Sequence, residues 1–397
     1  MKKSLIALAA LSTIAGSVAA QSSVTIYGRI NPGYADQKIT DAAGKVTQTQ
    51  GYQANGWTSP RLGVNIVEDL GAGMSAIGTW EANIATESTA VGTVRQGFAG
   101  LKGSFGQVTI GNQYTTEYGQ GITVAGTVNS YGFGSSGLEL TSTQKKTATA
   151  VHRLGEISGG NSIRWTAPAV SGITFAADLG KSVSQATGAS GGANTTDTQT
   201  DFLGLSANYK AGALDATLAY AEAKSQSLAV TGDYIVSTGT SSVTVTRAAS
   251  CTASSSVQCQ TITAAADAVN TKQKNWTASG TYTLGAAKLF AYYADRELTG
   301  TSALDYKAYN FGAQYAIGKF TPFAQMSTGK MKNAAGTTIN DLKSTQVGVT
   351  YAFSPRTTGY AYVAEYKDDV ALSYAGSAAT TNSKKATATS VGISHNF

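Results

Sequence analysis

Charged side chains are scarce in this sequence, and their scarcity already excludes several classes of protein. Asp, Glu, Lys and Arg make up 13% of the 397 residues, roughly half of the share of about 25% that is usual for a soluble globular domain. Beyond the first twenty residues the chain also lacks a run of the roughly 18 uninterrupted apolar residues that a membrane helix needs. A bundle of membrane helices is therefore excluded, and an ordinary soluble domain is disfavoured.

Histidine and cysteine are rare as well, which leaves few groups for catalysis. His152 and His395 have no Ser or Asp at a spacing that indicates a catalytic arrangement, and no glycine-rich segment has phosphate-loop spacing. Cys251 and Cys259 favour a local disulfide in an exported protein over a metal pair, because no histidine or acidic cluster lies nearby. We therefore expect no enzyme activity, no cofactor and no metal site.

The first twenty residues predict a secretory signal peptide. Lys2 and Lys3 precede an apolar run at 5–15, and small residues at 18–20 offer a cleavage site before Gln21. Without those two lysines the formal net charge of +6 falls to +4, which is too mild to indicate a nucleic-acid partner. The sequence thus predicts a signal peptide at 1–20 and a mature protein at 21–397.

Glycine and tyrosine, by contrast, are plentiful, at 45 and 20 residues. An exported chain that is rich in tyrosine, weakly charged and free of apolar helices is typical of a transmembrane β-barrel. Apolar and polar residues alternate along its strands, so the hydropathy averaged over a window of residues stays low. The mean hydropathy of -0.09 agrees with this, although a soluble exported β protein could match it.

Alternation of apolar and polar residues with a period of two predicts about sixteen strands. They cover residues 24–34, 60–68, 74–85, 93–102, 107–113, 161–167, 173–180, 201–209, 213–224, 272–284, 288–297, 305–316, 320–330, 342–353, 357–367 and 386–397. Short turns alternate with longer polar connections, the longest at 225–271; the turns lie near Gly71, Gly103, Ser171, Gly212, Gly285, Gly318 and Pro355. Tight periplasmic turns and long external loops are typical of an outer-membrane barrel.

The same alternation assigns the two faces of each strand. Leu62, Val64 and Ile66 fall on the side that we expect to meet lipid, and Arg61 and Asn65 fall on the side that we expect to face a wet interior. The first and last strands must then pair, because an open sheet edge in hydrocarbon leaves N–H and C=O groups without partners. Export and alternation alone would also permit a large soluble sandwich.

Two groups of aromatic residues are expected at the membrane boundary. Tyr360, Tyr362 and Tyr366 share one face of their strand and indicate part of an aromatic girdle. The terminal Phe397 shares the outward parity of Val391 and ends the barrel at that boundary.

The stretch at 93–153 contains a hairpin and then a connection without strand periodicity. Residues 114–150 are too long for an ordinary structureless loop, so the connection is either functional or disordered. We expect it to fold into the barrel's lumen as a constriction loop. Glycine and serine at 132–137 would permit tight packing against the wall, although they could equally form a flexible linker.

Arginines fall on the polar parity of several strands and indicate a pore constriction. The set is Arg29, Arg61, Arg95 and Arg164, with Arg153 at the end of the long connection, and the only acids at 114–150 are Glu117 and Glu139. Converging arginines would form a positive strip, and the two acids facing it would produce a transverse field that tunes ion selectivity. The alternative is that each arginine is an ordinary solvated lumen residue paired with a nearby acid.

Several sequence segments together resemble the general porins of β-proteobacteria. They are SSVTIYG at 22–28, RLG at 61–63 followed by EDLG at 68–71, RQ at 95–96 leading to GSFGQVTIG at 103–111, NSIRWTAP at 161–168, and the closing Phe397. The resemblance implies an all-β, 16-stranded antiparallel transmembrane barrel in the cell outer membrane of a Gram-negative bacterium. It also implies a homotrimer whose third external loop, here 114–150, folds inward opposite basic eyelet positions at Arg61, Arg95 and Arg153.

The chain departs from the pattern of that family at a few positions. Pro60 stands where relatives usually have Ser, Asn65 and Ile66 stand where an arginine and a glycine are common, and Asn112 replaces another arginine. The cysteine-bearing loop is also unusually long. These departures favour at most a mild preference for anions.

Taken together, the sequence predicts an outer-membrane diffusion channel for small hydrophilic solutes and ions. Its expected partners are outer-membrane lipid and further copies of the same chain, with no nucleic acid. Two alternatives stay open: a substrate-specific porin, and a structural or adhesive barrel that conducts little.

Overall fold

Nearly all of the described chain is β-strand. The computed structural model describes residues 22–41, 43–54, 56–84, 91–119, 159–185, 196–229, 232–238, 243–248, 257–262, 271–300, 303–370 and 383–397. These residues form twenty-one strands, β1 to β21, and one helical turn at 116–119. In these ranges no helix has both the length and the apolar character needed to cross a membrane.

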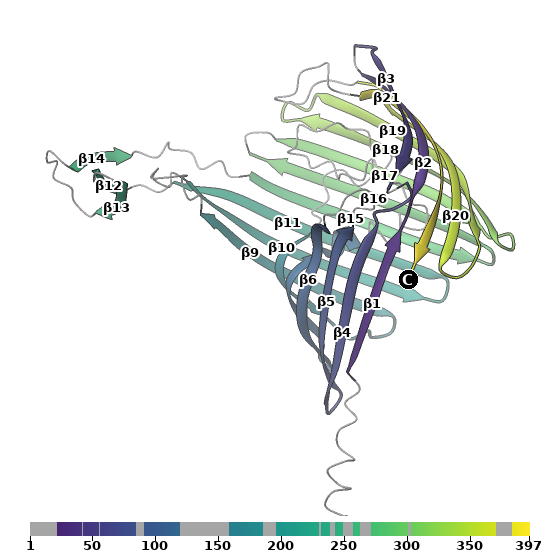
Figure 1. Cartoon of the computed structure of the whole chain (residues 1–397), viewed down its shortest axis with the longest axis horizontal. Helices are drawn as coiled ribbons and strands as arrows, with labels where there is room; N and C mark the ends of the chain where they lie inside the picture. Colours follow the sequence, from purple (N-terminus) through teal and green to yellow (C-terminus); the bar gives the residue numbers. More distant parts are fainter. Residues whose placement is uncertain are drawn as a thin grey trace, which may run out of the picture.

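Sixteen strands form a closed antiparallel ring. The large sheet has eighteen strands, and setting aside the hairpin β2–β3 leaves sixteen around the barrel. In ring order these are β1 (Ser23–Ile30), β4 (Arg61–Gly71), β5 (Met74–Ile84), β6 (Val91–Gly103), β7 (Gly106–Tyr114), β8 (Gly159–Thr166), β9 (Ile173–Gln185), β10 (Thr196–Ala211), β11 (Leu214–Ala229), β15 (Thr271–Leu284), β16 (Ala287–Thr299), β17 (Leu304–Tyr315), β18 (Phe320–Asn333), β19 (Thr338–Ala352), β20 (Thr357–Asp368) and β21 (Ser383–Asn396). The predicted sixteen-stranded antiparallel barrel is therefore confirmed (Figure 1).

The ring closes where the two ends of the chain meet. Arg29 on β1 pairs with Asn396 on β21, and Gly28 and Phe397 exchange backbone hydrogen bonds of 3.0 and 3.1 Å. A side chain at Gly28 would place its Cβ 2.4 Å from the Phe397 ring, so only glycine fits there. Closure gives every strand of the wall two neighbours, as a hydrocarbon environment requires.

The first predicted strand is in fact divided in two. β1 ends at Ile30, and β2 (Gly33–Asp41) continues along β21 before turning back as β3 (Val46–Gln53). Pro32 has no N–H to donate to the ladder and stands at this break, while the Asn31 side chain donates to the carbonyl of Thr58 at 2.6 Å. Figure 1 shows the β2–β3 hairpin extending the wall beyond β1.

Apolar side chains cover the outside of the wall. Val24, Ile26, Ile66, Val363 and Val391 are each between 48% and 67% exposed. Their strand neighbours of opposite parity face the interior, as the buried side chains of Glu81, Thr109 and Asp178 show on other strands. The predicted lipid-facing parity of Ile66 and of Val391 agrees with this arrangement.

The inner wall is not polar throughout, which corrects a second expectation. Tyr360, Tyr362 and Tyr366 are at most 3% exposed and point inward, so they form no aromatic girdle. The ring of Trp57, in the connection from β3 to β4, packs on Tyr360 and Tyr362 at centroid distances of 5.2 and 5.8 Å and on Phe323 at 5.3 Å. Parity alone could not separate an aromatic face that meets lipid from one buried in this way.

Short turns lie at one end of the barrel and the longer connections at the other. Gly285, for example, takes a φ of 57° in the two-residue turn between β15 and β16, a conformation that glycine adopts without strain. Within the long connection predicted at 225–271, β11 extends to Ala229, and β12 (Gly232–Thr238), β13 (Val243–Ala248) and β14 (Val257–Ile262) form a separate small sheet. Figure 1 shows this sheet apart from the barrel wall.

Candidate functional site

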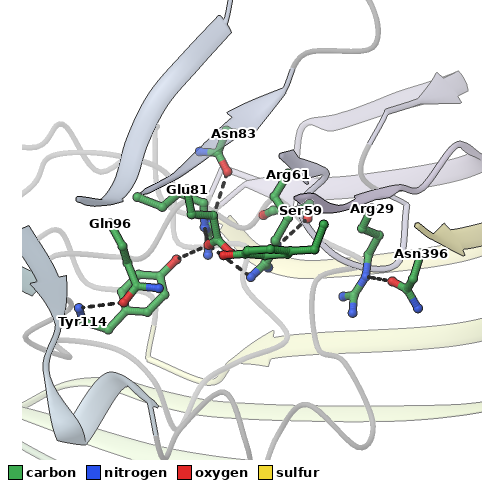
Figure 2. Close-up of polar contacts among 10 residues, drawn as sticks. Arg29, Ser59, Arg61, Glu81, Asn83, Gln96, Tyr114 and Asn396 are labelled. Atoms are coloured by element: carbon green, nitrogen blue, oxygen red, sulfur yellow. Dashed lines mark hydrogen bonds and ion pairs between the residues drawn. The ribbon is translucent and has the colours of Figure 1, made fainter. Parts of the chain in front are cut away.

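Three arginines meet on the inner wall near the point where the barrel closes. Arg29 on β1 lies directly opposite Arg61 on β4, and Arg95 comes from β6. Between them, on β5, lies Glu81, which is 4% exposed. Figure 2 shows Arg61 beside Glu81 and Arg29 beside Asn396.

A β-bulge brings Arg95 into this group. The pairing of β5 with β6 shifts from Glu81 opposite Gln96 to Ala82 opposite Val94, so Arg95 has no residue opposite it. An extra residue of this kind bends the strand and redirects its side chain. The result is that Arg95 and Gln96 both contribute to the same polar group, and Arg95 also donates to Asn83 Oδ1 at 2.8 Å.

Glu81 is the acceptor at the centre of the site. Its Oε1 accepts from Arg95 Nε at 2.9 Å and lies 3.5 Å from Arg61 Nη1. Two tyrosine hydroxyls also donate to this carboxylate, Tyr27 to Oε2 at 3.0 Å and Tyr114 to Oε1 at 3.3 Å. One carboxylate thus holds the side chains of β1, β4, β6 and the end of β7 in place.

The site carries a surplus of positive charge. Among the described residues, three guanidinium groups and one carboxylate give the site a net charge of plus two. Arg29 binds Asn396 Oδ1 through Nε at 2.7 Å, and within the described ranges it has no carboxylate partner. Arg95 Nη2 is buried and has no hydrogen-bond partner among the described residues.

An ion pair between Arg164 and Asp178 lies next to this group. Arg164 on β8 binds the Asp178 carboxylate on β9 and also donates to the backbone carbonyl of Tyr114. Because the Tyr114 hydroxyl contacts Glu81, this residue links the two groups. Arg164 therefore adjoins the positive strip, but Asp178 compensates its charge.

The segment after β7 turns into the barrel. Thr115 caps the helical turn through its hydroxyl, which accepts from Tyr118 N at 3.1 Å, and Thr116 donates to Asp178 at 3.1 Å. On the other side, Glu117 contacts Arg296 on β16. The start of the predicted constriction loop is thus held against two parts of the inner wall.

Glu117 does not face the arginine strip as the sequence suggested. It is 2% exposed, its Oε1 lies 3.0 Å from Arg296 Nη2, and Asn275 Nδ2 donates to both of its oxygens at 3.0 and 2.9 Å. A buried carboxylate requires a partner that compensates its charge, and the fold supplies Arg296 from 179 residues away. Glu117 therefore anchors the chain instead of facing the arginines across the lumen.

The comparisons with known proteins agree with this architecture. The profile of the Gram-negative porin family matches residues 7–371. The chain belongs to that family. This porin is accordingly a protein of the cell outer membrane, and its family is one of channels rather than enzymes.

Curated relatives match a shorter part of the porin. It is 42% identical over 118 residues to the major outer membrane protein P.IB of Neisseria lactamica, a match covering 28% of this chain and 33% of that protein. It is 39% identical over 117 residues to outer membrane porin protein 32 of Delftia acidovorans, covering 28% and 31%. The match thus spans about a third of the length of these relatives.

Solved structures match the whole fold at low sequence identity. The anion-selective porin from Comamonas acidovorans superposes with a TM-score of 0.65 at 19% identity, covering 95% of this chain and 100% of that one. OmpT of Vibrio cholerae in a trimer form has a TM-score of 0.58 at 18% identity, covering 95% and 99%.

The remaining predicted residues of this porin fall outside the described ranges. They are Arg153, Glu139 and Cys251, with the loop beyond Gly119, so the disulfide to Cys259 stays a prediction. Three charged partners were missed from the sequence: Glu81, Asp178 and Arg296. Each of the two acids could have been found on the inward parity of its strand, next to a strand with an inward arginine.

Proposed function

We propose that this porin is a general diffusion channel for small hydrophilic solutes and ions, with a mild preference for anions set by Arg29, Arg61 and Arg95. Membership of the porin family and the closed barrel with outward apolar side chains support the channel. The surplus of two positive charges around Glu81 supports the sign of the preference, because low-dielectric walls focus the field of a charged strip on the ions passing it.

Arg29 contributes most to the proposed preference for anions. Arg95 lies 2.9 Å from Glu81 and Arg61 lies 3.5 Å from it, so the carboxylate compensates part of their charge. Arg29 contacts a neutral amide instead, and its charge is free to act on a passing anion. The remaining constriction residues of the proposal are Arg153 and Glu139 on the connection after β7, with Arg164 and Glu117 as anchors of its start.

The test is the reversal potential of the reconstituted porin across a salt gradient in a planar bilayer. A general channel gives stepwise conductance that does not saturate with solute, and a potential of the sign for anion passage. Saturable block by one class of solute would favour a substrate-specific porin, and insertion without conductance would favour a structural or adhesive barrel. A cation-selective sign would reject the assignment of the arginines.

We further propose that the porin assembles as a homotrimer. Support comes from the family and from the trimer form described for OmpT of Vibrio cholerae. Light scattering of the detergent-purified protein, corrected for bound detergent, measures the mass directly, and a monomeric mass would refute the trimer.

A further inference from the structure

One sector of the outer wall carries charged side chains at the loop end of its strands. On β11 and β15 the outward positions above the apolar band include Glu222, Lys224, Lys272 and Lys274. The loop ends of β4 to β8, within the described residues, place no charged side chain outward; Arg61 and Arg95 there contact Glu81 on the inner side of the wall. Outward charges therefore distinguish β11 and β15 from β4 to β8. They recur on β16 to β21, where Lys367 and Lys385 also lie opposite each other.

Two lysines of this sector are held next to each other. Lys224 and Lys272 lie directly opposite on neighbouring strands, an arrangement in which like charges repel. The Glu222 carboxylate lies 3.1 Å from each ammonium group. An ammonium group has three donors, so each lysine keeps donors for a further acceptor, and their side chains remain 47% and 36% exposed.

Directly below the lysines, the outer wall is hollowed by an apolar groove. The groove has a volume of about 420 Å³ and extends across β8, β9, β10, β11 and β15, a size typical of sites for small organic ligands. Its large side chains are between 45% and 55% exposed and comprise Trp165, Phe175, Leu205, Leu218 and Trp276. Alanines such as Ala177 and Ala207 form part of its lining.

Tyr220 joins the groove to the charged group above it. Its ring lines the groove and packs on Trp276 at a centroid distance of 4.6 Å. Its hydroxyl donates to Glu222 at 2.6 Å. The apolar groove and the lysine pair are therefore one continuous surface.

The depth of this surface matches one leaflet. From Lys224 to Leu218 is six residues along β11, or about 20 Å at roughly 3.4 Å per residue. A strand tilt of about 40° reduces this to about 15 Å of depth, which is half of a hydrocarbon core of about 30 Å.

We propose that this surface binds an anionic lipid of the outer leaflet, with its phosphate at Lys224 and Lys272 and an acyl chain in the groove below. The neighbouring charges are Lys181, Lys274, Asp201 and Glu297. With the lysine pair and Glu222 they sum to a net charge of plus one, which complements one phosphate. The binding is independent of the charges that line the lumen.

The test compares lipids that share acyl chains and differ in head group. The intact porin, purified in detergent, is mixed with dimyristoylphosphatidylglycerol or with dimyristoylphosphatidylcholine, and retained lipid is counted by native mass spectrometry. A lysine near a lipid phosphate contributes about fivefold to binding. The K224Q/K272Q variant should therefore lose at least fivefold of its phosphatidylglycerol binding and become indifferent to the head group.

Two further variants separate the site from the rest of the rim. K307Q/K330Q removes two rim lysines that also pair with single carboxylates, at 3.0 and 3.5 Å, and it should bind like the unchanged porin. Ala207→Phe fills the groove and should lower the binding of both lipids. Equal binding of the two lipids by the unchanged porin, or an equal loss in K307Q/K330Q, would overturn the proposal. So would a change in subunit number for Ala207→Phe, because a second copy would then be what covers the groove.

Discussion

Arg29 and Arg61 lie directly opposite each other on the inner faces of β1 and β4. Like charges at such positions repel by a few tenths of a kcal/mol up to about 1 kcal/mol. Of these two arginines, only Arg61 lies within ion-pair distance of Glu81, at 3.5 Å. The charge of Arg29 on the inner wall therefore lowers the stability of the barrel. This relationship connects the architecture of the seam to the electrostatics of the channel.

Replacing Arg29 with Ser should shift the reversal potential toward cation passage. The variant removes a cation without leaving a carboxylate unpaired, so the barrel should be as stable as the unchanged porin or slightly more stable. Bilayer recording in a salt gradient measures the first effect, and the temperature at which the heat-resistant fast band in gel electrophoresis is lost measures the second. An unchanged reversal potential would make Arg29 an ordinary lumen residue.

Replacing Glu81 with Gln should act in the opposite direction on selectivity. The net charge of the site would rise from plus two to plus three, so the preference for anions should increase. Arg95 would lose the one carboxylate partner it has among the described residues, in a buried setting, which costs about 3 kcal/mol. Denaturant unfolding and reversal potential should both change, and an increase in cation passage would contradict the assigned geometry.

The contact between Glu117 and Arg296 should prove essential for holding the inward segment. Either E117Q or R296Q alone leaves a buried charge without its partner and should lower stability by about 3 to 5 kcal/mol. The double variant should recover part of that loss. A double-mutant cycle on the free energy of unfolding measures the coupling, and strictly additive losses would show that the two side chains act independently.

Closure of the barrel should depend on the size of residue 28. Gly28→Val places a branched side chain where a Cβ alone would lie 2.4 Å from Phe397, so little heat-resistant barrel should form. Gly160→Val is the matched control, since a Cβ there meets no described atom within 4 Å. If both variants fold with equal yield, the contact of Gly28 with Phe397 is not what limits closure.

The wall of this barrel could be predicted from the sequence because strand periodicity is a local property. Leu62, Val64 and Ile66 alternate with Arg61 and Asn65 whether or not the rest of the chain is known. The arginines on the inward parity were found in the same way. The sixteen strands and the inward direction of Arg29, Arg61, Arg95 and Arg164 follow from that alternation.

The partners of those side chains depend on long-range register, which the sequence does not display. Glu117 and Arg296 are 179 residues apart, and the bulge that redirects Arg95 is visible only when β5 and β6 are paired. Tyr360 and Tyr362 show another limit, because an aromatic face looks the same whether it meets lipid or Trp57. Such features need the closed ring before they can be assigned.

The meeting of Gly28 with Phe397 has a consequence for how the protein can be made. β1 pairs with β4 on one side, but its neighbour on the other side is β21. A chain without β21 therefore has two unpaired edges that hydrocarbon will not accept. Membrane insertion of this porin therefore depends on β21, because the ring stays open without that strand.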